Sequence, residues 1–189
     1  MKGFVCSLLT LLVLALSACG NSNTANVPPT PSSTPSPTQT TEHYMAKLSA
    51  LNGSGVSGTV DLQLTGNTLV VTVDGRGLEP NQVHYQHIHG DHYSVSTCPT
   101  TADANASGII TLDKTLQKVG PVAFDFGPYS PTNQHGTIHW SQTFNLDSPE
   151  LFAITPLVQH VVVIHGLTSQ GVYEKVLPAA CAPIVVVPR

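Results

Sequence analysis

Two histidines one residue apart carry the clearest chemical signal in this sequence. They lie in the segment Val83–Gly90, which reads VHYQHIHG, and we expect a β-strand over Val83–His89. Successive side chains of a strand point to opposite faces, so His87 and His89 share one face while Ile88 points into the core. Imidazoles with an ordinary pKa of about 6.5 are neutral at pH 7, so both rings are able to bind one metal ion.

A third imidazole comes from a distant part of the chain. The apolar segment 159–166 ends in His165 and Gly166. His160 has the opposite parity from His165, so the two cannot face one site on a regular strand. We therefore expect His165, at the end of the strand, to be the ligand. Three imidazoles from two strands suit Cu(II) or, less specifically, Zn(II).

Two further histidines lie close to this pair in the sequence. His84 falls on the opposite face of a regular strand and joins the site only if a bulge intervenes. His92, in the loop that follows, is an additional candidate ligand. The alternative for His87 and His89 is that they form hydrogen bonds inside a metal-free β-sandwich.

A weaker metal motif lies in the segment 103–110, which reads DANASGII. Its alternating oxygens, followed by glycine and an apolar residue, resemble the opening of an EF-hand calcium loop. The closing glutamate of such a loop would fall at Lys114, which is wrong for Ca²⁺. The segment is therefore interpreted as a plain turn, and calcium is not expected.

The elements that must position these histidines are β-strands. Apolar and polar residues alternate with a period of two, between turns rich in Gly, Pro and Asn, and helix signals are nearly absent. This pattern predicts an all-β, antiparallel sandwich or barrel. One helical turn is expected within Thr155–Val158. The other expected strands are Tyr44–Leu51, Val56–Leu64, Leu69–Val73, Ile109–Leu112, Val122–Phe126, Thr137–Phe144, Gln159–Ile164 and Ile184–Val187.

The first residues of the chain have the pattern of an export signal. A positive start at Lys2 and an apolar run precede Leu16-Ser17-Ala18-Cys19, which resembles the lipobox of bacterial lipoproteins. The resemblance implies cleavage of residues 1–18 and acylation of Cys19, which would anchor the protein to the membrane of the cell envelope. Residues 19–41 are rich in Pro, Ser and Thr and are expected to be a tether. Residues 42–189 remain as one domain.

Charge and cysteine content narrow the function further. The chain has a net charge of −4 and no basic stripe, so nucleic acid is not an expected partner, and no protein partner is indicated. Cys98 and Cys181 are the cysteines of the expected domain, and an even pair in an exported domain favours a disulfide. Free thiols or copper thiolates are the alternatives.

Several short motifs together resemble the copper/zinc superoxide dismutases. His87-Ile88-His89 with Gly90-Asp91 looks like the copper-binding strand of that family, and Val162–His165 looks like the late strand with another copper histidine. Cys98 and Ala180-Cys181 resemble the positions of the family's disulfide cysteines. The likeness spans most of Leu51–Val187 and implies a Greek-key β-barrel with a copper site. The HIHG string also resembles the CHRD module of exported bacterial proteins.

Departures from the dismutase pattern limit the expected activity. No histidine lies between Tyr93 and Gln134, where the family has its zinc ligands, so a zinc site of that type is not expected. Pro178 takes the position of the active-site arginine, and few cations are present to steer superoxide. The sequence thus predicts a copper protein with weak or copper-only dismutase activity. The alternatives are a copper carrier and a non-enzymatic CHRD-like module without metal.

Overall fold

The computed structural model describes residues 39–188 of the chain. The expected signal peptide, the lipidation site at Cys19 and almost all of the expected tether lie outside these residues. The described part contains strands, two α-helices and two 3₁₀ turns, and its first strand begins at Thr41. The strands are β1 (Thr41–Ala50), β2 (Ser57–Thr65), β3 (Thr68–Arg76), β4 (Gln86–His89), β5 (Val122–Asp125), β6 (Ile138–Asn145), β7 (Val161–Ser169) and β8 (Val172–Val186).

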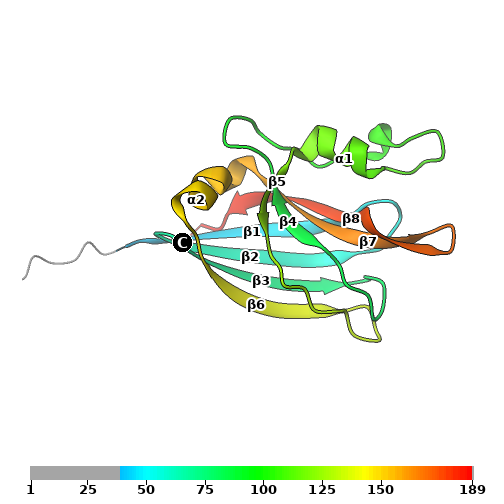
Figure 1. Cartoon of the computed structure of the whole chain (residues 1–189), viewed down its shortest axis with the longest axis horizontal. Helices are drawn as coiled ribbons and strands as arrows, with labels where there is room; N and C mark the ends of the chain where they lie inside the picture. Colours follow the sequence, from blue (N-terminus) through cyan, green and yellow to red (C-terminus); the bar gives the residue numbers. More distant parts are fainter. Residues whose placement is uncertain (1–38, 189) are drawn as a thin grey trace, which may run out of the picture. The chain divides into compact units, whose positions relative to one another are not determined.

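These strands form one antiparallel sheet in the order β5-β4-β7-β8-β1-β2-β3-β6. The neighbours β3–β6 and β4–β7 are not consecutive in sequence, which gives the sheet Greek-key connections. Figure 1 shows the sheet curled into a half-barrel, with β4 and β5 in front of β1–β3. The expected all-β, antiparallel fold is confirmed.

The hydrophobic core lies inside this curl. On β2, the inward residues Val60, Leu62 and Leu64 are buried, while Asp61 and Gln63 between them are more exposed. The same alternation on β3, β4 and β7 brings side chains from both halves of the sheet into one cluster. That cluster includes Leu69, Val71, Val73, Ile88, Phe124, Val162, Ile164 and Ile184. Ile88 is fully buried, as its position between two histidines predicted.

A second, smaller cluster covers the outer face of β7 and β8. Val161, Val163 and Cys181 pack there against Leu51, Ile110 and Val119. Cys98, in the loop after β4, forms a disulfide with Cys181 on β8, as expected, and thereby ties this loop to the sheet. The loop continues into helix α1 (Leu112–Val119), which lies over this side of the sheet in Figure 1.

The largest differences from the sequence-based expectation concern one expected strand, helix α2 and strand β8. The strand expected at Ile109–Leu112 is wrong, because the chain there turns and enters α1. Helix α2 (Ser148–Ile154) was not expected, although Asp147 and Glu150 form a capping box at its start. Strand β8 is much longer than Ile184–Val187, because its first half, which includes Glu174, Lys175 and Pro178, pairs with β7. The 3₁₀ turns are η1 (Thr101–Asp103) and η2 (Leu157–Gln159), and η2 overlaps the expected helical turn.

Neither helix in the part of the chain that the structure describes is long and apolar enough to cross a membrane.

Candidate metal centre

Strand register brings three histidines to the outer face of the sheet. His87 on β4 lies opposite Val163 on β7, and His89 lies opposite Val161. Residues that are direct partners across an antiparallel pair share a face. His165 has the same parity as Val161 and Val163, so it points to the same side as the two β4 histidines.

The end of β7 is adapted to this position of His165. Its backbone N–H donates to the carbonyl oxygen of Tyr85 at 2.8 Å, which extends the pairing with the chain before β4. The register with β8 shifts at His165, where the partner Pro178 has no N–H to donate. Gly166 follows with φ +105°, a conformation that other residues rarely adopt. A side chain at Gly166 would also collide with the Tyr173 hydroxyl.

The three rings form a compact group. The ring centroid of His87 lies 5.5 Å from that of His89 and 5.4 Å from that of His165, and the other two are 5.8 Å apart. One nitrogen from each ring lies within 4.8 Å of the others. Among the described residues, this is the group of three or more His, Cys, Asp or Glu side chains whose ligand atoms lie that close together. His89 and His165 are buried, with exposed fractions of 1% and 3%.

One nitrogen of each ring has an acceptor that orients it. His89 Nδ1 lies 3.1 Å from the carbonyl oxygen of Gly120, and His165 Nδ1 lies 2.8 Å from that of Val176. A carbonyl oxygen can only accept, so both Nδ1 atoms carry the proton. His87 Nε2 lies 3.4 Å from a carboxylate oxygen of Asp125. These contacts fix which ring nitrogen keeps a free lone pair.

The remaining nitrogens are buried and unpaired. His87 Nδ1, His89 Nε2 and His165 Nε2 have no hydrogen-bond partner among the described residues. Buried polar atoms in native proteins nearly always have a partner, so three such atoms in one small group require an explanation. A metal ion satisfies all three at once. The outer hydrogen bonds match the arrangement in which metal-bound histidines are held by a carboxylate or a backbone carbonyl.

Burial keeps these histidines neutral. Desolvation lowers the pKa of His89 to about 4, against a smaller opposing effect of the Gly120 carbonyl. Desolvation also lowers the pKa of His165 to about 4, and the Val176 carbonyl opposes it only partly. The pKa of His87 is lowered as well, because desolvation outweighs the attraction of Asp125. The lone pairs are therefore available to a metal at neutral and mildly acidic pH.

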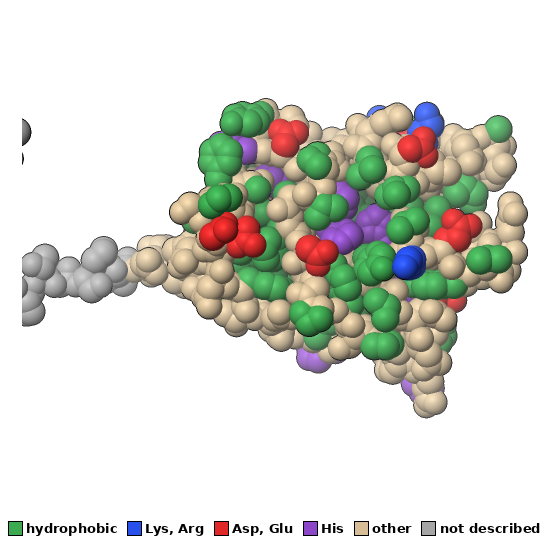
Figure 2. Space-filling model, in the orientation of Figure 1, with side chains coloured by type: hydrophobic (Ala, Val, Ile, Leu, Met, Phe, Trp, Pro, Cys, Tyr) green, Lys and Arg blue, Asp and Glu red, His purple; other side chains and the backbone are tan. Residues whose placement is uncertain are grey.

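A cavity of about 230 Å³ opens beside the three rings. Its other walls are apolar or aromatic: Tyr85, Leu112, Leu116, Val122 and Val176. None of the described residues that line it is Lys, Arg, Asp or Glu. Figure 2 shows histidine side chains near the middle of one face, among hydrophobic side chains, with an acidic and a basic side chain nearby. The cavity wall itself is therefore uncharged, although Asp125 lies beside His87 and Lys175 lies over the Tyr85 ring.

The other candidate histidines lie elsewhere. His84 is buried, with Nδ1 2.9 Å from the carbonyl oxygen of His165 and Nε2 3.2 Å from that of Glu79. His92 Nδ1 lies 2.5 Å from the carbonyl oxygen of Thr155, and its ring stacks on Phe152. The structure does not bring either ring into the group of three. His84 instead supports the backbone of His165.

In the segment 103–110, which resembles the opening of a calcium loop, the side-chain oxygens of Asp103 and Asn105 contact nearby residues. A carboxylate oxygen of Asp103 accepts from the Thr100 N–H at 2.8 Å, and the other lies 3.1 Å from Lys118 Nζ. Asn105 Oδ1 accepts from the backbone N–H groups of Ser107 and Ile109. These bonds belong to a turn, as the sequence indicated.

Sequence reasoning did not identify the residues that hold the three rings. Asp125 lies on β5 directly opposite His87, and Gly120 follows helix α1. Asp125 lies within the expected strand Val122–Phe126, so the face of that strand to which Asp125 points could be derived from the sequence. Its pairing with β4 could not, because nothing local specifies which strands become neighbours. Gly120 and Val176 act through backbone carbonyls, which leave no side-chain signal.

Comparisons with solved structures include matches to a superoxide dismutase. No family model matches the sequence, and no curated protein matches it. Superoxide dismutase 5 of Candida albicans with Cu(II) matches with a TM-score of 0.48 and 14% identity, over 79% of this chain and 94% of that chain. A single-residue variant of it matches with a TM-score of 0.49 and 15% identity, over 78% and 94% of the two chains. These values leave family and function to be argued from the site itself.

Proposed function

We propose that this protein binds one copper ion through His87, His89 and His165. The observation that carries the proposal is the set of three buried ring nitrogens without partners, one from each residue. An unpaired buried polar atom costs about 1 to 3 kcal/mol, so three of them on adjacent strands are unfavourable unless they bind something. A cation is the partner that accepts three lone pairs.

The donor set favours copper. All three donors are neutral imidazoles, which suit copper and zinc better than the hard cations Mg²⁺ and Ca²⁺. Copper has the highest affinity of the first-row divalent metals for such a site. Three histidines argue against a structural zinc site, which has four protein ligands, but not against a catalytic zinc site, which has three. Cys98 and Cys181 form a disulfide, so neither offers a thiolate.

The protein's own residues would hold, orient and shield the metal. The Gly120 and Val176 carbonyls fix the rings of His89 and His165, and Asp125 fixes His87. The apolar walls beside the rings limit the water around the site. Bound copper would supply one-electron redox chemistry between Cu(I) and Cu(II). We propose weak superoxide dismutation as the activity, because the described residues that line the cavity include no Lys or Arg to attract the anion.

Copper loading of the full chain tests the binding. We expect one tightly bound Cu(II) per chain, with nitrogen hyperfine structure in the electron paramagnetic resonance spectrum. The double variant His87→Ala/His89→Ala should lose this spectrum. The matched control is His43→Ala/His135→Ala, which removes two exposed histidines outside the group and should leave the spectrum unchanged.

Two outcomes contradict the proposal. Copper that stays bound in the His87→Ala/His89→Ala variant would place the site elsewhere. A wild-type chain that never binds copper would leave a metal-free β module of the CHRD sort. If copper binds, a superoxide assay on the loaded protein separates a dismutase from a copper carrier.

We also infer that the protein is exported and anchored by a lipid. The disulfide supports an oxidising compartment, in which such bonds persist. The lipobox-like segment that ends in Cys19 supports the anchor. Incorporation of labelled palmitate into the wild-type chain, and its loss in Cys19→Ala, would test this. Unchanged labelling of Cys19→Ala would contradict it.

A further inference from the structure

His87 is held differently from the other two histidines of the group. Backbone carbonyls orient His89 and His165, but a side-chain carboxylate lies next to His87. Asp125 is the direct partner of His87 across β4 and β5, so the two side chains share the outer face of the sheet. The distance of 3.4 Å between Asp125 Oδ2 and His87 Nε2 is longer than an ordinary N–H···O bond.

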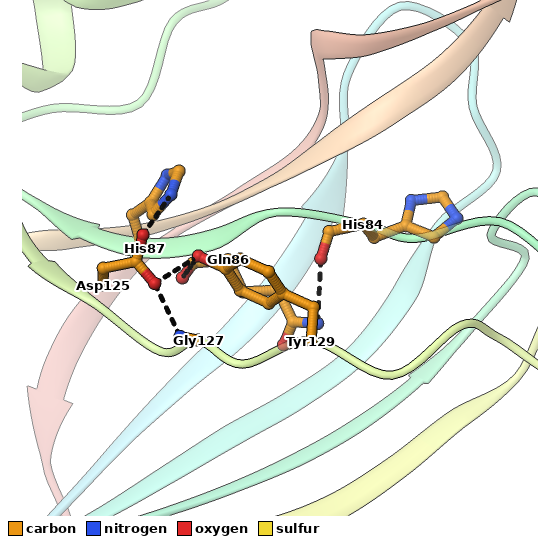
Figure 3. Close-up of polar contacts among 6 residues, drawn as sticks. All are labelled: His84, Gln86, His87, Asp125, Gly127 and Tyr129. Carbon is orange, nitrogen blue, oxygen red and sulfur yellow. Dashed lines mark hydrogen bonds and ion pairs between the residues drawn. The ribbon is translucent and has the colours of Figure 1, made fainter.

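The other oxygen of Asp125 accepts two hydrogen bonds. The Tyr129 hydroxyl and the Gly127 N–H both donate to Asp125 Oδ1 at 2.5 Å. Figure 3 shows Asp125 between the ring of His87 and these two donors. The Tyr129 ring packs against Tyr85 and lies 6.3 Å from the His87 ring, so its position is fixed by the same wall of the cavity.

The contacts of Asp125 determine which nitrogen of His87 carries the proton and how much negative charge lies beside that ring. A carboxylate beside His87 Nε2 stabilises the tautomer with the proton on Nε2, which leaves the Nδ1 lone pair free. A metal on Nδ1 makes the N–H more acidic and strengthens its bond to the carboxylate. The negative charge of Asp125 also stabilises a doubly charged ion more than a singly charged one. Each donor to Oδ1 spreads that charge and weakens its effect on His87.

We propose that Asp125 and Tyr129 are a pair of positioning residues that set the preference of the site between Cu(II) and Cu(I). Asp125 orients His87 and favours Cu(II). Tyr129 holds Asp125 in place and moderates its charge, so it acts in the opposite sense. This inference rests on the proposed copper site, and it assigns a role to two residues that are not ligands.

Metal competition on the full chain tests the proposal. Affinities for Cu(II) and for Cu(I) are measured separately against chelators of known strength. Removal of a hydrogen-bonding partner of a metal-bound histidine typically costs about 10- to 100-fold in affinity. Asp125 is 56% exposed on its side chain, so screening by solvent favours the lower end. Asp125→Asn should therefore lose about tenfold in Cu(II) affinity, with a smaller loss for Cu(I).

Tyr129→Phe should shift the ratio of the two affinities the other way. It removes one donor from Asp125 Oδ1 and leaves the Gly127 N–H in place, so Cu(II) gains relative to Cu(I). Asp125→Glu keeps the charge and should retain more of the wild-type ratio than Asp125→Asn does. The controls are Asp61→Asn and Tyr93→Phe, which make the same chemical changes outside the site. Thermal unfolding of each metal-free variant checks that the fold is intact.

The outcomes separate this inference from the proposed function. Folded variants whose Cu(II)/Cu(I) ratio is unchanged, or moves in the same direction for Asp125→Asn and Tyr129→Phe, overturn the tuning role while copper binding stands. Opposite shifts support it, because a purely structural role would not change the sign. A wild-type chain that binds neither ion overturns the proposed function and this inference together.

Discussion

His89 and Gly120 are joined by a hydrogen bond of 3.1 Å between Nδ1 and the carbonyl oxygen, across a sequence separation of 31 residues. Gly120 ends helix α1 with φ +78°, and the loop before that helix is tied to the sheet by the disulfide. The same helix contributes Leu112 and Leu116 to the cavity wall. The orientation of His89 therefore depends on how firmly this loop is held.

Removal of the disulfide should weaken both the fold and the site. We expect the double variant Cys98→Ser/Cys181→Ser to lose up to about 4 to 5 kcal/mol in the free energy of unfolding, since a long loop is no longer closed. Its copper affinity should also fall, because the Gly120 carbonyl is less firmly placed. The disulfide is removed by substitution with serine and not by chemical reduction, because reduction would leave two thiols that can bind copper. Urea unfolding and copper competition measure the two effects, and an unchanged affinity in a folded variant would show that Gly120 is held without the disulfide.

Acid should destabilise the metal-free protein through its buried histidines. His89 and His165 have a pKa of about 4 in the folded state, against an ordinary 6.5 when unfolded. The unfolded chain therefore binds more protons between these values. Stability is lost as the pH falls from about 6.5 to about 4, by up to about 1.4 kcal/mol per pH unit for each group.

Urea unfolding of the metal-free chain at several pH values between 4 and 7 measures this slope. His89→Gln removes one contributing group and should flatten it. The comparison of the two slopes isolates the histidine from carboxylates, which protonate mainly below this range. Equal slopes for the wild type and His89→Gln would mean that His89 has the same pKa in the folded and the unfolded chain.

Positive charges at the cavity opening should introduce steering of anions. Leu112 and Leu116 line the cavity and are partly exposed, so lysine at both positions would place cations beside the proposed copper site. We expect the association rate of azide with the loaded protein to rise about tenfold at low salt and to fall again as salt is added. Stopped-flow absorbance measures this rate. Leu112→Gln/Leu116→Gln is the neutral control, and an equal gain there would point to wider access rather than charge.

Neighbouring residues on β4 should have separable roles. Ile88 is fully buried in the core, and Ile88→Ala should cost about 2 to 5 kcal/mol in the free energy of unfolding. The folded fraction should still bind copper. His87→Ala should abolish copper binding at a smaller cost in stability, because it removes a buried nitrogen that has no partner. Chemical unfolding and copper titration of both variants check this, and loss of copper from folded Ile88→Ala would contradict it.

Local alternation made one part of the site predictable from sequence. His87, Ile88 and His89 alternate between the outer face and the core as a regular strand requires, and the parity of His165 followed from the same rule. The burial of Val60 and Leu62 in the core could be predicted in the same way. Each of these inferences needs only the period of two along a strand.

Features that depend on pairing between distant segments were not predictable. Strand β8 pairs with β7 along most of its length and with β1 in its second half, although its first half includes the charged residues Glu174 and Lys175 and also Pro178. The contact of Asp125 with His87 requires β5 to be the neighbour of β4, which no local pattern states. Helix α2 is a different case, because its capping residues Asp147 and Glu150 are a local signal that the sequence itself contains.

The hydrophobic core and the candidate metal site lie on opposite faces of the half-barrel. The large apolar cluster lies inside the curl, while the three imidazoles lie on the opposite side of the same strands. The core that stabilises the fold therefore contains none of the three candidate metal ligands. If the chain is exported and binds copper as proposed, its β-sheet and disulfide can therefore form before the ion binds.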